Sequence, residues 1–122
     1  MKIYTSYYAR VNNLINDGIV PISISLYNPP QYIGLKYRKL APTIQTLSKY
    51  KSNPDTCIYT EMYRKSVLDR LEAKKVVDEL ESLSKGRDVA LICYEKYDKF
   101  CHRFLVAGWL TYFLGIDVKE YM

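Results

Sequence analysis

The sequence contains no apolar run long enough to cross a membrane. A spanning helix needs about 20 predominantly apolar residues, and the longest apolar stretch, residues 104–114, is too short. The first residues lead into a mixed segment instead of the apolar core of a signal peptide. We therefore expect a cytoplasmic protein from a bacterium, an archaeon or a phage, with a bacterial host cell as the favoured setting and with no membrane partner.

The three cysteines form none of the familiar cysteine motifs. An odd number of cysteines in a cytoplasmic chain favours reduced thiols over a disulfide framework. A zinc site would have to use Cys93, Cys101 and His102, with Cys57 or Glu95 as a fourth ligand. Adjacent Cys101 and His102 are poorly spaced for a closed tetrahedral site, and no Cys-x2-Cys pair is present. The Cys-x5-Arg spacing of phosphatase loops is also absent, so we expect no metal and no other cofactor.

The charge of the chain is moderate and dispersed. The net charge is +5, and the basic residues are spread from Lys2 to Lys119 without a long basic run. A positive charge favours association with phosphates, but the dispersal makes a nucleic-acid partner less favoured than a small anionic ligand. With 122 residues, no internal repeats and no low-complexity segment, the chain is expected to form one domain, residues 1–122. Small domains of this kind often form homodimers.

Tyrosine is the most over-represented residue, at 13 of 122 positions. Tyrosine offers a large contact area and one hydroxyl group at little cost in rotamer entropy. The surplus suits a pocket that stacks on planar rings. Tyr59 and Tyr63, four residues apart, would share a helix face toward such a ligand, although a core role explains them equally well. Trp109 is expected to serve packing.

Alternating and helical hydrophobic patterns predict the order of the elements. Strands are expected over residues 2–6, 19–26, 89–94 and 116–121, and helices over residues 7–17, 42–51, 72–85 and 104–114. Gly86 is the expected C-cap of the third helix. The last helix is apolar nearly all round, which predicts that it is buried, either within the fold or against a second copy of the chain. Residues 31–40 are expected to form a loop, and residues 57–63 are ambiguous, with a short strand leading into a helix as one reading. The order predicts an α/β fold, a single three-layer domain with a small, mainly parallel, Rossmann-like sheet.

Two predicted strand ends carry unusual polar chemistry. The strand 89–94 is followed by Glu95 and, after a short loop, by Cys101, His102 and Arg103 at the start of a helix. Ligands of parallel sheets bind beyond the carboxyl ends of the strands, so we expect this segment to meet the loop that follows residue 25. The predicted ligand-binding residues are Ser25, Tyr27, Pro30, Tyr37, Tyr63, Glu95, Cys101, His102 and Arg103. Lys36 to Lys39 offer further cations, for which a solvated loop is the simpler explanation.

Three interpretations of this segment stay open. In the first, Cys101 or Cys93 is a nucleophile and His102 or Glu95 is its acid or base. In the second, the helix start and Arg103 bind an anion without catalysis. In the third, Cys93 belongs to the core, Glu95 and Arg103 form an ion pair, and His102 has a structural role.

These residues resemble the family called domain of unknown function 488. The resemblance lies in Leu91-Ile92-Cys93-Tyr94-Glu95, in Cys101-His102-Arg103, in the preceding helix at residues 76–80 and in the ending at residues 115–118. A subset of the family also shares Ile24-Ser25 followed by prolines, and the stretch at residues 37–42. Family members usually carry an arginine just after the second strand, where this chain has Leu26 or Tyr27. If that arginine binds a phosphate or takes part in catalysis, we expect this chain to have lost activity and kept binding.

The leading functional hypothesis is a small binding protein for a phosphate-bearing, nucleotide-like ligand, such as a phage protein that sequesters a host immune signalling nucleotide. The alternative is an enzyme that acts on a nucleoside, nucleotide or nucleobase through Cys93, Glu95, Cys101 and His102. The resemblance to the family implies a role in nucleotide or nucleic-acid modification and in phage conflict, and it leaves the reaction open.

Overall fold

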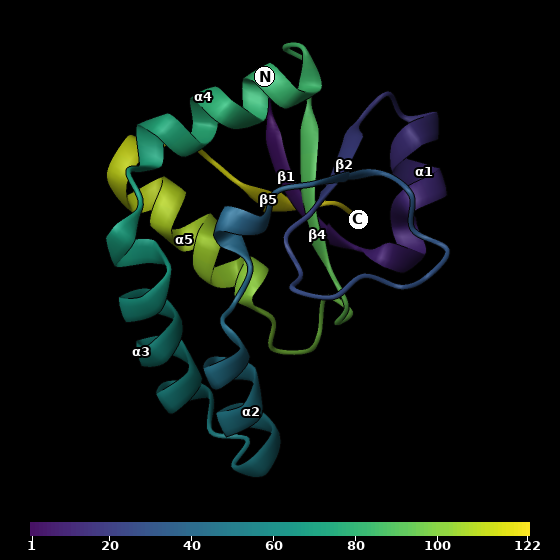
Figure 1. The fold of residues 1–122 in the computed structure, drawn as a ribbon. Coiled ribbons are helices and arrows are strands. Elements are labelled where there is room, and N and C mark those ends of the chain that lie inside the picture. The colour runs from purple at the N-terminus through teal and green to yellow at the C-terminus, as the bar shows by residue number, and fades with distance from the viewer.

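A fully parallel five-stranded sheet forms the centre of the computed structural model, which describes all 122 residues (Figure 1). The strands are β1 (Ile3–Tyr7), β2 (Val20–Ser23), β3 (Leu35–Lys36), β4 (Val89–Cys93) and β5 (Lys119–Glu120). Their spatial order is β3–β2–β4–β1–β5, and every neighbouring pair is parallel. The predicted α/β class is therefore confirmed, with a sheet that is parallel throughout.

Strand β4 is the middle strand, and all five of its residues are buried. Side chains alternate along a strand, so Val89 and Leu91 enter the larger hydrophobic core while Ala90 and Ile92 enter the smaller one on the opposite face. A strand with both faces covered has no polar face, which explains its uninterrupted apolar run.

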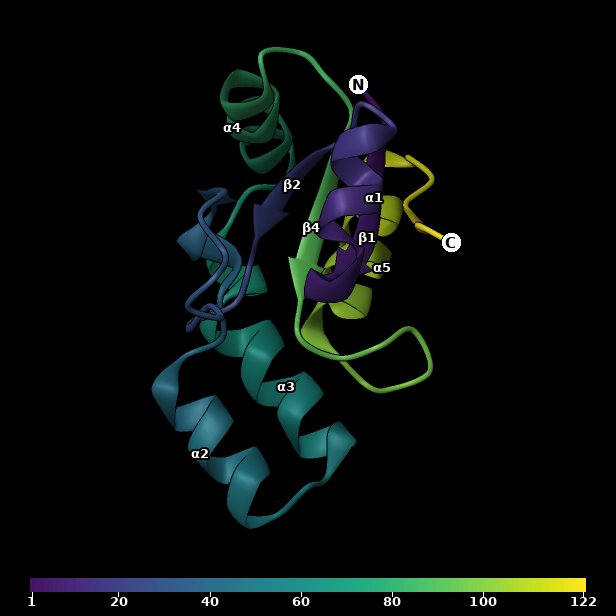
Figure 2. The ribbon, with the colours of Figure 1, turned by 90° about the vertical axis from the view of Figure 1, so that its right-hand side faces the viewer.

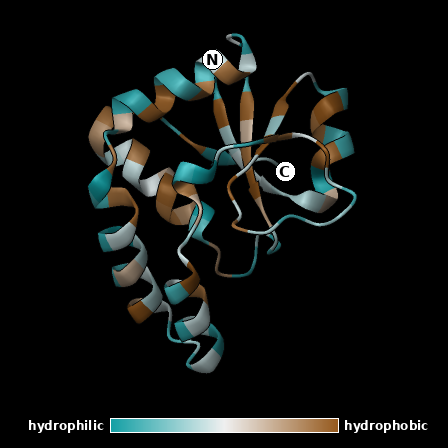
Figure 3. Cartoon of the chain, viewed as in Figure 1, coloured by the Kyte–Doolittle hydropathy of each residue, from teal (hydrophilic) through white to brown (hydrophobic).

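Helices cover both faces of the sheet and complete three layers (Figure 2). Helix α1 (Val11–Asn16) lies on one face and contributes Leu14 to the smaller core. Helices α4 (Ala73–Ser84) and α5 (His102–Leu114) lie on the other face and contribute Leu80 and Leu110 to the larger core. Apolar residues accordingly concentrate in the strands and on the inner sides of the helices (Figure 3). None of the helices has the length and apolar character that a membrane span requires.

Helices α2 (Ile44–Ser52) and α3 (Thr56–Ser66) form a hairpin that projects past the carboxyl ends of the strands (Figure 1). The strand considered for residues 57–63 is wrong, because Asp55 caps a helix there: its carboxylate accepts bonds from the N–H groups of Cys57 (2.9 Å) and Ile58 (3.2 Å). Residues 31–40 form a loop as predicted, interrupted by the two-residue β3 and by a 3₁₀ turn at Arg38–Leu40.

Several boundaries differ from the prediction. Strands β2 and β5 are shorter than the apolar patterns 19–26 and 116–121 suggested, and Lys85, with φ +56°, caps α4 in place of Gly86. Residues 104–114 are not buried on every side within the chain, since Tyr112 and Phe113 are 82% and 62% exposed. Helix α5 belongs to an outer layer, so only one of its faces packs against the sheet.

Candidate functional site

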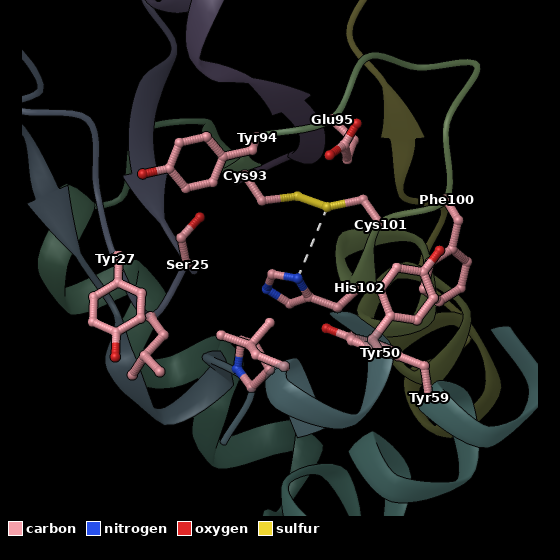
Figure 4. A pocket seen from close by; sticks show the side chains of 13 residues that line it. Ser25, Tyr27, Tyr50, Tyr59, Cys93, Tyr94, Glu95, Phe100, Cys101 and His102 are labelled. Atoms are coloured by element: carbon pink, nitrogen blue, oxygen red, sulfur yellow. Dashed lines mark hydrogen bonds between the residues drawn. A yellow bond between two sulfur atoms is a disulfide. The ribbon is translucent and has the colours of Figure 1, made fainter. Parts of the chain in front are cut away.

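The ends of β2 and β4 lie side by side at one edge of the sheet. The two strands are hydrogen-bonded neighbours, with Ser23 opposite Ile92, and the Ile24 N–H continues the pairing to the Ile92 carbonyl at 3.0 Å. The segments that leave these strands therefore meet. They enclose a pocket of about 180 Å³ with the α2–α3 hairpin as its far wall (Figure 4).

Aromatic rings make up much of the pocket wall. They belong to Tyr27, Tyr50, Tyr59, Tyr94 and Phe100. The other lining residues are Ser25, Leu26, Pro42, Leu47, Cys93, Glu95, Cys101 and His102. No lysine or arginine is among them, so the pocket itself suits a planar, mostly apolar group better than a phosphate.

Three of the rings hold one another in place. The ring of Tyr59 lies edge-on to Tyr50 at 5.2 Å and to Phe100 at 5.1 Å between centroids. Burial raises the pKa of Tyr59, so its hydroxyl stays protonated at neutral pH. Tyr50 and Phe100 were not among the predicted site residues. Tyr50 falls in the predicted helix 42–51 and Phe100 in the short loop before Cys101, and only the hairpin fold brings them together.

The structure pairs Cys93 and Cys101 as a disulfide. The expectation that the thiols are reduced is therefore wrong for these two cysteines and holds for Cys57, which is free and exposed on α3. The pair forms because Cys93 ends β4 and Cys101 is the N-cap of α5, so that the loop 94–100 returns the chain to the point where it left the sheet.

His102 is the first residue of α5 and is 6% exposed. Its Nε2 lies 2.7 Å from the Ile24 carbonyl oxygen. Burial lowers the pKa of His102 to about 4, and the charge of Arg103 adds to this, although the bond to Ile24 opposes it. The imidazole is therefore neutral at pH 7. A carbonyl only accepts, so Nε2 carries the proton and Nδ1 is left with a free lone pair.

The free lone pair of His102 faces sulfur. Nδ1 lies 3.8 Å from the Sγ of Cys101, and the dashed line in Figure 4 marks this contact. When the disulfide is reduced, the Cys101 thiol has a proton acceptor beside it. The arrangement offers a thiol and a neutral base at the wall of a pocket.

The hydroxyl of Ser25 is a second unused polar group in the pocket. Ser25 is 6% exposed, and its Oγ has no hydrogen-bond partner. Figure 4 shows Ser25 at the wall of the pocket, and its Oγ is closed off from solvent. An unpaired buried hydroxyl costs free energy, and a rotation of the Ser25 side chain toward a ligand in the pocket would remove that cost.

Arg103, one of the predicted binding residues, lies outside the pocket. Its guanidinium is fully buried and donates to both carboxylate oxygens of Glu120, from Nε at 3.1 Å and from Nη2 at 2.9 Å. Its Nη1 donates to the Sγ of Cys93 at 3.2 Å. The ion pair suggested between Arg103 and Glu95 is also wrong, because Glu120 is the partner and Glu95 lines the pocket.

Three other predicted binding residues also lie outside the pocket. Tyr63 is fully buried behind His102, with 5.4 Å between the rings, and its hydroxyl donates to the Leu40 carbonyl at 2.5 Å. Tyr37 donates its hydroxyl to Glu79 at 2.6 Å. Pro30 lines a neighbouring groove instead. The structure thus brings together Ser25, Tyr27, Cys93, Glu95, Cys101 and His102 among the predicted residues.

The neighbouring groove, of about 500 Å³, shares Leu26 and Tyr27 with the pocket. Lys36 and Arg38 line it, and neither forms an ion pair. Arg38 is oriented by a bond from Nη1 to the Leu26 carbonyl at 3.1 Å. No acidic residue lines this groove, so its charge is positive.

The loop that contains Asn28, between the pocket and the groove, is held in place by Tyr8, which directly follows β1. Asn28 accepts a bond from the hydroxyl of Tyr8 at 2.8 Å, and the same hydroxyl is bonded to Ser23 at 2.7 Å. The ring of Tyr8 in turn packs on Tyr94 at 5.0 Å. The ends of β1, β2 and β4 are therefore connected around the site.

Comparison with protein families identifies the chain's relatives. Residues 20–113 match the family model DUF488-N3a, described as the active DUF488-N3 subclade. The protein belongs to the DUF488 family. The match includes both strand ends that form the pocket, which agrees with the Cys-x-Glu and Cys-His-Arg resemblance seen in the sequence. Among curated proteins and among solved structures, no match to the chain was found.

Proposed function

We propose that this DUF488 protein binds a nucleotide-like ligand, with the planar ring in the aromatic pocket and the phosphate in the adjoining groove. The observation that carries the proposal is the pocket itself, whose wall combines five aromatic rings with Ser25, a buried residue with an unpaired hydroxyl. A base offers both a ring face for stacking and polar edges for a hydrogen bond.

The size of the pocket supports a division of the ligand between two spaces. Its volume of about 180 Å³ is below the about 300–1,000 Å³ of pockets that enclose a drug-sized molecule, so it suits one ring system. The rest of a nucleotide would pass Tyr27, which borders both spaces, and reach Lys36 and Arg38.

The proposal is tested by calorimetric titration and thermal-shift measurements with a graded panel. The panel holds inorganic phosphate, a nucleoside, the matching nucleoside monophosphate, a cyclic dinucleotide and ADP-ribose. We expect the base-bearing phosphates to bind more tightly than the nucleoside, and phosphate alone to bind weakly. A cyclic dinucleotide that binds tightly would support sequestration of a signalling nucleotide. A flat response across the panel with folded protein would contradict the proposal.

A second candidate is an enzyme that acts on the same class of ligand. It is favoured by the lone pair of His102 Nδ1 beside the Cys101 sulfur and by the description of the matched subclade as active. In the reduced protein, Cys101 would be the nucleophile, His102 its base and Glu95 a further acid or base. Nucleotides incubated with reduced protein are analysed by mass spectrometry. Turnover that is lost in Cys101→Ser and Glu95→Gln supports the enzyme, and unchanged nucleotides contradict it.

A further inference from the structure

We propose that Cys93, Cys101 and His102 form a binding site for a zinc-like divalent ion when the two cysteines are reduced. Their ligand atoms, two Sγ and one imidazole nitrogen, all lie within 4.8 Å of one another. All three residues are buried and line the pocket. The inference does not depend on which ligand the pocket takes.

The backbone places both sulfurs around one point. The Cα atoms of Cys93 and Cys101 are 7.3 Å apart, wider than the about 4.4–6.8 Å usual for disulfides. After reduction, the two sulfurs are no longer bonded to each other. They can then move apart while both remain close to the imidazole of His102. Two thiolates and one imidazole form a donor set that favours Zn²⁺ over oxygen-loving cations such as Mg²⁺.

His102 is oriented as a metal ligand. Histidines that bind a metal through one ring nitrogen almost always donate the other N–H to a carboxylate, a carbonyl or water. Here Nε2–H donates to the Ile24 carbonyl at 2.7 Å, which leaves Nδ1 directed at the sulfur of Cys101. The imidazole is thus fixed in the tautomer that binding requires.

The surroundings also suit a thiolate. Arg103 donates to the Cys93 sulfur at 3.2 Å, a bond that stabilises a negatively charged sulfur. Glu120 neutralises the guanidinium through two bonds, so its charge does not repel an ion strongly. Three protein ligands at a pocket wall leave a fourth position for water or for a pocket ligand, which is the arrangement of catalytic zinc sites.

The spacing argument from the sequence missed this site because it considered a closed structural site with four ligands. Cys101 is the N-cap and His102 is the first residue of α5. At a helix start, two consecutive residues can turn toward the same point, as the 3.8 Å between Sγ and Nδ1 shows.

Formation of the zinc site requires a reductant for the disulfide and then the ion itself. A thiol reductant supplies two electrons and two protons that convert the disulfide into two thiols. Binding of Zn²⁺ then releases the two thiol protons. A small-molecule disulfide that takes up two electrons from the two thiolates would re-form the Cys93–Cys101 bond and release the ion.

The test is a titration of the reduced full-length protein with Co²⁺, whose thiolate complexes absorb visible light when the site is tetrahedral. We expect saturation at about one ion per chain and loss of the absorption when Zn²⁺ is added. The Cys57→Ser variant should behave like the parent protein, since Cys57 lies outside the cluster. Cys93→Ser and His102→Gln should each lose the absorption, and circular dichroism checks that they are folded.

A second measurement needs no variant. Reduced protein is treated with an alkylating reagent with and without Zn²⁺, and the modified cysteines are identified by mass spectrometry. We expect Zn²⁺ to protect Cys93 and Cys101 while Cys57 reacts equally in both samples. Absence of the cobalt absorption together with unchanged alkylation of Cys93 and Cys101 would overturn the proposal. Because both readouts omit nucleotides, they are separate from the test of ligand binding.

Discussion

Arg103 and Glu120 form a two-armed ion pair that joins the start of α5 to the edge strand β5. The guanidinium is completely buried, and the Glu120 side chain is 14% exposed. Removing one partner of a buried pair leaves the other charge uncompensated, at a cost of about 3–5 kcal/mol. We predict that Glu120→Gln lowers the free energy of unfolding by this amount, measured by urea denaturation.

The control for this prediction is an exposed pair of the same length. Glu61 and Lys65 are 2.9 Å apart on the surface of α3. We expect Glu61→Gln to leave the unfolding midpoint nearly unchanged, because exposed pairs contribute little. Equal destabilisation by Glu120→Gln and Glu61→Gln would show that burial does not make the Arg103–Glu120 pair more important for stability than an exposed pair.

Ser25 and Ser6 provide a matched pair of buried hydroxyl groups without partners. Only Ser25 lines the pocket. We predict that Ser25→Ala and Ser6→Ala each keep or raise the free energy of unfolding, by on the order of 1 kcal/mol, because each removes an unsatisfied polar group. Only Ser25→Ala should weaken nucleotide binding. Calorimetric titration of both variants distinguishes a ligand contact from a general packing effect.

Arg38 and Lys39 are adjacent in sequence but differ in their partners. Arg38 lines the groove without an ion pair, whereas Lys39 is paired with Glu79 at 2.9 Å. We predict that Arg38→Gln weakens binding of a nucleoside monophosphate at least tenfold and leaves nucleoside binding unchanged. Lys39→Gln should alter neither. An identical loss in both variants would point to overall charge instead of a phosphate contact.

The buried His102 predicts a dependence of stability on pH in the metal-free protein. Its pKa is about 4 in the folded state, against an ordinary value of 6.5. Between these values the unfolded chain binds a proton that the folded chain does not, so stability falls as pH drops from 6.5 toward 4 and the loss levels off below 4. The full loss is about 3 kcal/mol.

The measurement is urea denaturation of the parent protein and of His102→Gln at several pH values from 7 to 5, above the range in which most carboxylates titrate. The parent should lose stability steadily across this interval. The variant should lose much less, because it lacks the titrating group. If the free energy of unfolding depended on pH in the same way in the parent and in His102→Gln, the pKa of His102 would be the same in the folded and unfolded states, and the prediction would be wrong.

Much of the site could be predicted because its residues follow strand ends. An unbroken apolar run locates β4, and Ile22 and Ile24 locate β2, so the sequence indicates that Ser25 and Glu95 leave the same edge of a parallel sheet. Alternation along the strand and the start of an apolar helix also locate Cys93 and Cys101. These are local patterns, and they survive in the fold.

The rest depends on contacts between distant segments. Glu120 lies in a two-residue strand with no strong pattern of its own, so nothing in the sequence identifies it as the partner of Arg103. Tyr50 and Phe100 meet only because the α2–α3 hairpin folds against the loop after β4. The sequence analysis did not predict the disulfide, because it inferred reduced thiols from the expected cytoplasmic location and not from the distance between the two cysteines.

The position of β4 between β2 and β1 has a consequence for synthesis of the chain. β1 and β2 emerge first, but in the finished sheet each is bonded to β4 and not to the other. A nascent chain that ends before Val89 therefore lacks the strand that joins its two halves. The pocket, which needs both Ser25 and His102, therefore forms only after His102 has been synthesised, long after both strands that flank β4.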